Sequence, residues 1–155
     1  MIYHQPEYER PFDDSIIRSV DAVVNTTFNK NISLDVKQHM SDNIYEREFR
    51  TVFMQLPRRC GKTVYLNKLL DHFRRNMGLN TWLVVPRTLM KKDLYGNHSK
   101  VLTLREINDP NNYIFCRWLN GLEDGNKPEV MLYDEVHPHT ENILRGSKFT
   151  LGLYT

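Results

Sequence analysis

The segment Leu56–Thr63 reads Leu-Pro-Arg-Arg-Cys-Gly-Lys-Thr and joins a short apolar run to a segment with helical spacing of apolar residues. Gly-Lys-Thr at the junction of a buried strand and a helix is typical of a phosphate-binding loop. In such a loop, backbone N–H groups and the positive end of the helix dipole face the phosphates. Lys62 is expected to reach the β and γ oxygens, and the Thr63 hydroxyl to ligate Mg²⁺. The motif therefore predicts a site for ATP and Mg²⁺, although Leu56 stands where the common pattern has its first glycine.

A second motif, Val-Met-Leu-Tyr-Asp-Glu at residues 130–135, is an apolar run that ends in two acids. At the end of a strand beside the loop, the carboxylate of Asp134 would hold the water shell of Mg²⁺. Glu135 would orient the attacking water. An acidic turn after a core strand is the alternative, because Asp-Glu pairs are common. The order of the two motifs, with a strand and a helix between them, favours the nucleotide site.

Two arginines, Arg58 and Arg59, lie inside the loop. Surface charge, or a general attraction to phosphate, is one interpretation of both. The other is that one of them contacts the γ-phosphate from within the same chain and stabilises charge in the transition state, as an arginine finger does. We expect Arg58 to take this role, with Lys62 and Glu135 as the other catalytic residues.

Apolar spacing along the chain predicts the elements that position these residues. Helices are expected from Ser15 through Val24, from Leu34 towards Tyr45, over Lys62–Met77 with Gly78 as its end, and over Thr88–Leu94. Short apolar runs predict strands at residues 50–56, 81–86, 113–119, 129–133 and 148–155, with a turn-rich loop at residues 120–127. These elements predict an α/β fold, a P-loop NTPase three-layer sandwich with a mostly parallel central sheet. We divide the chain into an N-terminal arm and helix, residues 1–30, and a P-loop ATPase lobe, residues 31–155.

Composition excludes several classes of protein. The chain has 155 residues, of which 40% are hydrophobic and 26% charged, as suits one globular domain with a core of its own. It has no run of 18 apolar residues, and acids stand where a signal peptide needs basic and then apolar residues, so we expect a protein that stays in a cytoplasm. The net charge of +2 neither requires nor excludes nucleic acid as a partner. Cys60 and Cys116 form no disulfide framework.

The loop closely resembles that of the terminase large subunits of tailed phages and herpesviruses. That family replaces the first glycine of the loop and carries a basic residue just after it, as Leu56–Thr63 does. It places a glutamine that reads adenine upstream, in a Leu-x-x-x-Gln pattern that Leu34–Gln38 matches. It also has an apolar strand ending in Asp-Glu, matched at Asp134 and Glu135, and a later strand ending in a Thr/Ser-rich coupling motif, whose start matches Leu151–Thr155. The resemblance covers residues 30–155.

The resemblance implies an ATPase domain that drives DNA translocation into a viral capsid. It implies a nucleotide site made by Gln38, Pro57, Arg58, Arg59, Cys60, Gly61, Lys62 and Thr63, with Mg²⁺ held by Thr63 and, through water, by Asp134. The expected partners are double-stranded DNA, a portal or small terminase subunit, a separate nuclease chain, and further copies of this chain on DNA or portal. The expected location is the cytoplasm of an infected host cell. Family members continue into a nuclease domain with an acidic metal cluster, which this chain lacks, so we expect a detached or reused ATPase lobe and assign no DNA cleavage to it.

Two other functions stay open. The first lobe of a superfamily two helicase has the same order of elements: Gln38 would be its Q-motif, Val84–Met90 the segment that grips DNA phosphates, and Asp134–His137 a DExH box. Against it, helicase loops have small residues and glycine where Arg58-Arg59-Cys60 stand. The non-enzyme alternative is a nucleotide-binding module that acts by docking onto a partner, because motors of this kind complete their sites with a second lobe or subunit.

Overall fold

The structure is a computed structural model, and it describes residues 3, 15–96, 100–109, 128–140 and 143–155. Within these residues, five parallel strands form one sheet in the order β1-β5-β4-β2-β3. The strands are β1 Thr51–Gln55, β2 Thr81–Val85, β3 Val101–Thr103, β4 Val130–Asp134 and β5 Phe149–Tyr154. β5 lies between β1 and β4, so the segments that follow these three strands meet at one edge of the sheet.

The strands at the centre of the sheet are covered on both faces. Every residue of β4 is buried, and so are all residues of β5 except Tyr154. Strands covered on both faces read as continuous apolar runs rather than alternating ones, which explains why Val-Met-Leu-Tyr and Phe-Thr-Leu-Gly-Leu form them. The predicted α/β fold with a parallel sheet is confirmed.

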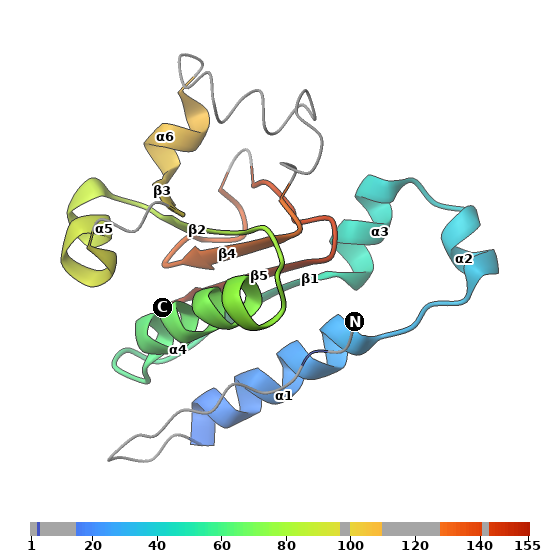
Figure 1. Cartoon of the computed structure of the whole chain (residues 1–155), viewed down its shortest axis with the longest axis horizontal. Helices are drawn as coiled ribbons and strands as arrows, with labels where there is room; N and C mark the ends of the chain where they lie inside the picture. Colours follow the sequence, from blue (N-terminus) through green and yellow to red (C-terminus); the bar gives the residue numbers. More distant parts are fainter. Residues whose placement is uncertain (1–2, 4–14, 97–99, 110–127, 141–142) are drawn as a thin grey trace.

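Helices cover the sheet unequally (Figure 1). The described helices are α1 Ser15–Asn29, α2 Leu34–Gln38, α3 Asp42–Phe49, α4 Lys62–Asp71, the π-helical turn η1 His72–Asn76, α5 Thr88–Tyr95 and α6 Leu104–Asn108. α1, α4 and η1 pack on one face, where their apolar side chains share a core with Leu83, Leu132 and Leu151 of the sheet. α6 lies over the other face, where Ile107 joins Val84, Met131 and Tyr133. None of the described helices has the length and hydropathy that a membrane crossing requires.

The helix predicted from Leu34 towards Tyr45 is wrong as a single element. The structure divides it into α2 and α3, with a break at residues 39–41. Two serines explain the break, because each caps its own helix. The Ser33 hydroxyl accepts a hydrogen bond from Val36 N at 3.4 Å, and the Ser41 hydroxyl accepts one from Ile44 N at 3.3 Å.

The other predicted elements agree with the structure where it describes them. The helix over Lys62–Met77 is continuous but widens into η1 at its end, where Met77 N donates to His72 O at 3.1 Å. Gly78 ends it with a φ of 65°, in the left-handed region that suits glycine. The predicted strand at residues 113–119 and loop at 120–127 lie outside the described residues. β3 and α6 were not predicted.

Candidate functional site

The loop between β1 and α4 is folded over the start of the helix. Leu56 N donates to Tyr154 O of β5 at 2.8 Å, which extends the sheet pairing one residue beyond β1. Arg59 and Gly61 then adopt left-handed conformations, with φ of 58° and 95°. The first hydrogen bond of α4 runs from Tyr65 N to Gly61 O at 2.9 Å, so the N–H groups of residues 62–64 have no partner within the helix. Backbone N–H groups at such a turn and helix start form a concave site for an anion.

Lys62 connects the loop to the acids at the end of β4. Its side chain is buried, with 7% of the residue exposed. The ammonium Nζ donates to Pro57 O at 3.2 Å and pairs with Glu135 Oε1 at 3.2 Å. The charge of Lys62 is thus held between the two motifs, where a phosphate group could compete for it.

Asp134 is fully buried at the end of β4. Its Oδ2 accepts hydrogen bonds from the Thr63 hydroxyl at 2.9 Å and from the Tyr95 hydroxyl at 2.6 Å. Burial raises the pKa of Asp134, and the hydrogen bonds from Tyr95 and Thr63 offset part of this effect. Among the described residues, nothing donates to the other oxygen, Oδ1, although it is buried too. A carboxylate with one unsatisfied oxygen beside a threonine hydroxyl fits Mg²⁺, which is held in proteins by one or two carboxylates together with water and phosphate oxygens.

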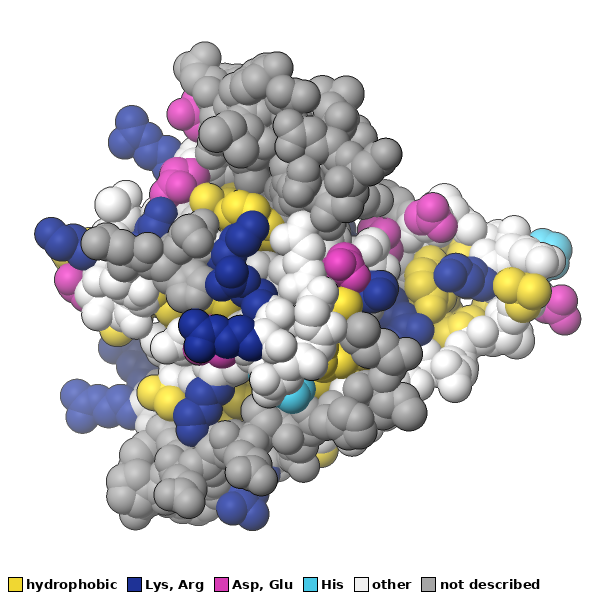
Figure 2. Space-filling view, in the orientation of Figure 1, with side chains coloured by type: hydrophobic (Ala, Val, Ile, Leu, Met, Phe, Trp, Pro, Cys, Tyr) yellow, Lys and Arg dark blue, Asp and Glu magenta, His cyan; other side chains and the backbone are white. Residues whose placement is uncertain are grey.

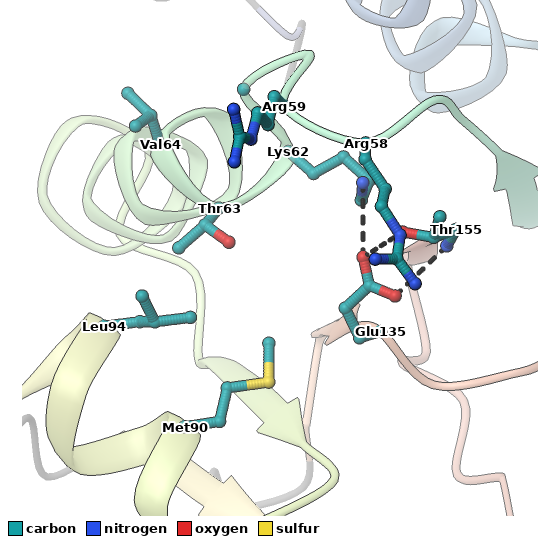
Figure 3. A pocket seen from close by; sticks show the side chains of 10 residues that line it. Arg58, Arg59, Lys62, Thr63, Val64, Met90, Leu94, Glu135 and Thr155 are labelled. Carbon is teal, nitrogen blue, oxygen red and sulfur yellow. Dashed lines mark hydrogen bonds and ion pairs between the residues drawn. The ribbon is translucent and has the colours of Figure 1, made fainter.

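Glu135 follows Asp134 in a left-handed conformation, with a φ of 58°, and its N–H donates to Leu153 O at 2.9 Å. This turn points the side chain towards the loop and the end of β5 (Figure 3). Thr155 donates its hydroxyl to Oε1 at 2.7 Å and its N–H to Oε2 at 3.1 Å. Burial raises the pKa of Glu135, but the hydrogen bonds from Thr155 and Lys62 outweigh it and the pKa lies below its ordinary value. Glu135 is therefore ionised at neutral pH.

Lys62, Thr63 and Glu135 line a pocket of about 510 Å³ that opens between the loop, α4 and α5 (Figure 3), and Asp134 lies buried behind Thr63. Arg58 and Arg59 are exposed at its rim, and neither forms an ion pair with a described residue. The described side chains that line the pocket are those of Arg58, Arg59, Lys62, Thr63, Val64, Met90, Leu94, Glu135 and Thr155. A cationic and hydrogen-bonding half therefore adjoins an apolar half in one pocket.

The other residues predicted to contact a nucleotide have different positions. The carbonyl of Pro57 accepts a hydrogen bond from Lys62, and the Cys60 side chain packs against the core and is in no disulfide. Gln38 is exposed on α2 and is not brought to the pocket. α2 leads through α3 into the start of β1, so Gln38 lies at the opposite end of the strands from the loop (Figure 1).

The sequence patterns did not reveal Tyr95, Met90 or Leu94 as site residues. All three belong to α5, which follows β2 and therefore begins at the edge of the sheet where the loop lies. That position is the one signal that pointed to α5. The contact between Tyr95 and Asp134 joins residues 39 positions apart, and no local spacing predicts it.

Replacing Tyr95 with phenylalanine is expected to weaken Mg²⁺ binding by about tenfold, as is typical when a partner that orients a metal ligand is removed. The change removes only the hydroxyl that holds Asp134 Oδ2. A titration of Mg²⁺ at fixed ATP, followed by the thermal stabilisation of the protein, measures the effect. Tyr45→Phe is the matched control, because Tyr45 is equally buried but lies on α3, away from Asp134. Its hydroxyl also has a hydrogen-bond partner, Arg50 Nε at 3.0 Å. Equal Mg²⁺ midpoints for the two variants would contradict a positioning role for Tyr95.

Comparison with known proteins does not assign the chain to a family. The chain matches no protein-family model, and searches of curated proteins and of solved structures find no match. The resemblance to terminases therefore depends on the sequence motifs alone, which are Leu34–Gln38, Leu56–Thr63, residues 130–135 and Leu151–Thr155.

Proposed function

We propose that the chain binds ATP and Mg²⁺ in the pocket between the β1–α4 loop and the end of β4, and hydrolyses the ATP. The observation that carries the proposal is a pair of contacts across β5. Lys62 pairs with Glu135 at 3.2 Å, and Thr63 donates to Asp134 at 2.9 Å. Two motifs far apart in the sequence thus meet, and they bring together side chains of the types that phosphoryl transfer to water uses.

The residues of the pocket and Asp134 would have separate roles in hydrolysis. The N–H groups of residues 62–64 and the ammonium of Lys62 would bind the β and γ phosphates, and Thr63 and, through water, Asp134 would hold Mg²⁺. Mg²⁺ supplies positive charge that offsets the charge of the β and γ oxygens. The ionised Glu135 would orient a water molecule and accept its proton as the oxygen attacks the γ phosphorus. The bond from that phosphorus to the β–γ bridging oxygen breaks, and ADP leaves with the bridging oxygen.

Calorimetric titration of the 155-residue chain with ATP, with and without Mg²⁺, tests the binding step. A phosphate-release assay on the same preparation tests the hydrolysis step. We expect tighter binding with Mg²⁺, and release of one phosphate per ATP consumed. Failure to bind ATP in the presence of Mg²⁺ would contradict the whole proposal.

Arg58→Ala is expected to lower ATP turnover by roughly 10- to 100-fold and to change ATP affinity much less. The estimate corresponds to one hydrogen bond from a charged group that strengthens in the transition state. Steady-state kinetics and direct titration separate the two effects. The control is Arg75→Ala, because Arg75 is also exposed but lies on η1, outside the pocket. A variant that loses affinity and keeps its turnover at saturating ATP would make Arg58 a phosphate anchor.

As the motor of a terminase-like machine, the lobe would act on double-stranded DNA in the cytoplasm of an infected host cell. Lys and Arg side chains gather over α4 and η1 on the face seen in Figure 2, and this segment carries Lys68, Arg74 and Arg75. Basic side chains on one face suit the phosphates of a duplex. Stimulation of ATP turnover by linear double-stranded DNA tests this part. Turnover that DNA leaves unchanged would restrict the proposal to ATP hydrolysis.

One observation favours the second candidate, a nucleotide-binding module without turnover of its own. Glu135 already contacts Thr155 through both of its oxygens and Lys62 through Oε1, and these contacts compete with an attacking water for the carboxylate. A partner that draws Thr155 away from Glu135 would then promote hydrolysis. Tight ATP binding without phosphate release from the isolated chain is the result that this candidate predicts.

A further inference from the structure

The apolar half of the pocket is made by Val64 of α4 and by Met90 and Leu94 of α5 (Figure 3). Val64 is 50% exposed and Leu94 is 47% exposed, so both present apolar surface to the pocket. Among the described residues that line the pocket, those from α5 carry no charge. We call these three side chains the apolar wall. The wall takes no part in holding phosphate or Mg²⁺, so its role lies elsewhere.

The orientation of a bound triphosphate follows from the positions of the charged and hydrogen-bonding groups in the pocket. Lys62 and Glu135 meet at one end, where the γ-phosphate would lie between the ammonium and the attacking water. The free N–H groups of residues 62–64 continue along the first turn of α4 and provide donors for the other phosphates. The last of these donors belongs to Val64, which also begins the apolar wall. A nucleotide bound in this direction carries its sugar and base towards α5.

We propose that the apolar wall holds the nucleoside by contact with its faces, and that the site therefore does not select among bases. This inference rests on the proposed function of the same pocket. An apolar surface packs against the face of any base, whereas selection between bases requires groups that hydrogen-bond to their edges. The described side chains of the wall carry no such group, and Gln38, the residue expected to read adenine, lies at the opposite end of the strands. The substrate class is any nucleoside triphosphate.

Competition for a fluorescent ATP analogue tests this specificity with ATP, GTP, CTP, UTP and inorganic tripolyphosphate, all with Mg²⁺ and the full chain. We expect the four nucleotides to bind within about threefold of one another, since all make the same apolar contact. We expect tripolyphosphate to bind about tenfold more weakly, because it buries no apolar surface on the wall.

The double variant Val64→Ala/Leu94→Ala tests the wall itself. Both side chains are about half exposed, so their truncation costs the fold little. The variant should remove most of the advantage of ATP over tripolyphosphate and leave the affinity for tripolyphosphate unchanged. Leu89→Ala is the matched control, because Leu89 is 68% exposed on the same helix but does not line the pocket. Gln38→Ala is a second control, and its ratio of ATP to GTP affinity should equal that of the unaltered chain.

Four results would overturn the inference, and one of them would also overturn the proposed function. A preference for ATP over GTP of tenfold or more would show that the site reads base edges. Equal affinities for ATP and tripolyphosphate would show that the nucleoside does not contact the protein. A double variant that keeps the full advantage of ATP would show that the nucleoside binds elsewhere. If neither nucleotides nor tripolyphosphate bind, the phosphate site is absent, and both the inference and the proposed function are wrong. In the other three cases tripolyphosphate still binds, so the inference is wrong but the phosphate site of the proposed function is supported.

Discussion

Lys62→Ala is expected to weaken binding of ATP with Mg²⁺ by roughly 100- to 1000-fold, the range for truncating one member of a buried, hydrogen-bonded charge pair. Lys62 is the one buried lysine of the described residues, and its ammonium lies 3.2 Å from Glu135. A bound triphosphate adds negative charge beside the ionised Glu135, and the cation of Lys62, which already contacts Glu135, offsets part of that repulsion. Without Lys62, the negative charges of Glu135 and the phosphates would face each other in a half-buried pocket. Titration with a fluorescent ATP analogue measures the change.

Lys68→Ala is the matched control for this variant. Lys68 lies on the same helix, so its replacement changes the net charge and the helix equally, but its side chain does not line the pocket. Circular dichroism of both variants should show the same helix content, because alanine suits a helix interior. If Lys62→Ala binds ATP as tightly as Lys68→Ala does, the loop does not bind phosphate and the proposed function is wrong.

The sequence predicted the sheet well because its buried strands are continuous apolar runs. β2 and β4 stand out for this reason, and the glycine at position 78 marks the end of the preceding helix. β3 has only three residues and follows a segment without a clear pattern, so its apolar run was too short to recognise. The order of the strands was not predictable either, since it depends on which apolar faces meet in the folded chain.

The charged half of the site was predicted because parallel strands end at the same edge of a sheet. A loop after β1 and acids after β4 then lie at the same edge, and they come close because β5 alone separates the two strands, as the contacts of Lys62 with Glu135 and of Thr63 with Asp134 show. The apolar wall and Tyr95 were not predicted, because an exposed leucine or a helical tyrosine has no distinctive spacing. Gln38 matched a pattern of residue types. Such a pattern does not determine at which end of the strands the helix that carries the glutamine lies.

Glu135→Gln is expected to lower ATP turnover by about 10²–10⁴-fold, the usual contribution of a positioned general base. Glutamine keeps the shape of the side chain and loses the charge that attracts a proton. The same change removes the ion pair with Lys62, which must otherwise be broken before the ammonium can turn to a phosphate. ATP affinity should therefore stay equal or rise by a few-fold. Single-turnover phosphate release and direct titration measure the two quantities separately.

Glu106→Gln separates the catalytic role of Glu135 from the general loss of an ion pair. Glu106 pairs with Lys91 at 3.2 Å, the same distance as in the Lys62–Glu135 pair, and its side chain is exposed to a similar degree but lies outside the pocket. A purely structural effect would change turnover in both variants alike. Loss of turnover together with a loss of ATP affinity in Glu135→Gln would point to a binding role instead, because a general base acts only after ATP is bound. Loss of turnover together with tighter ATP binding is the combination expected of a base that also pairs with a phosphate-binding lysine.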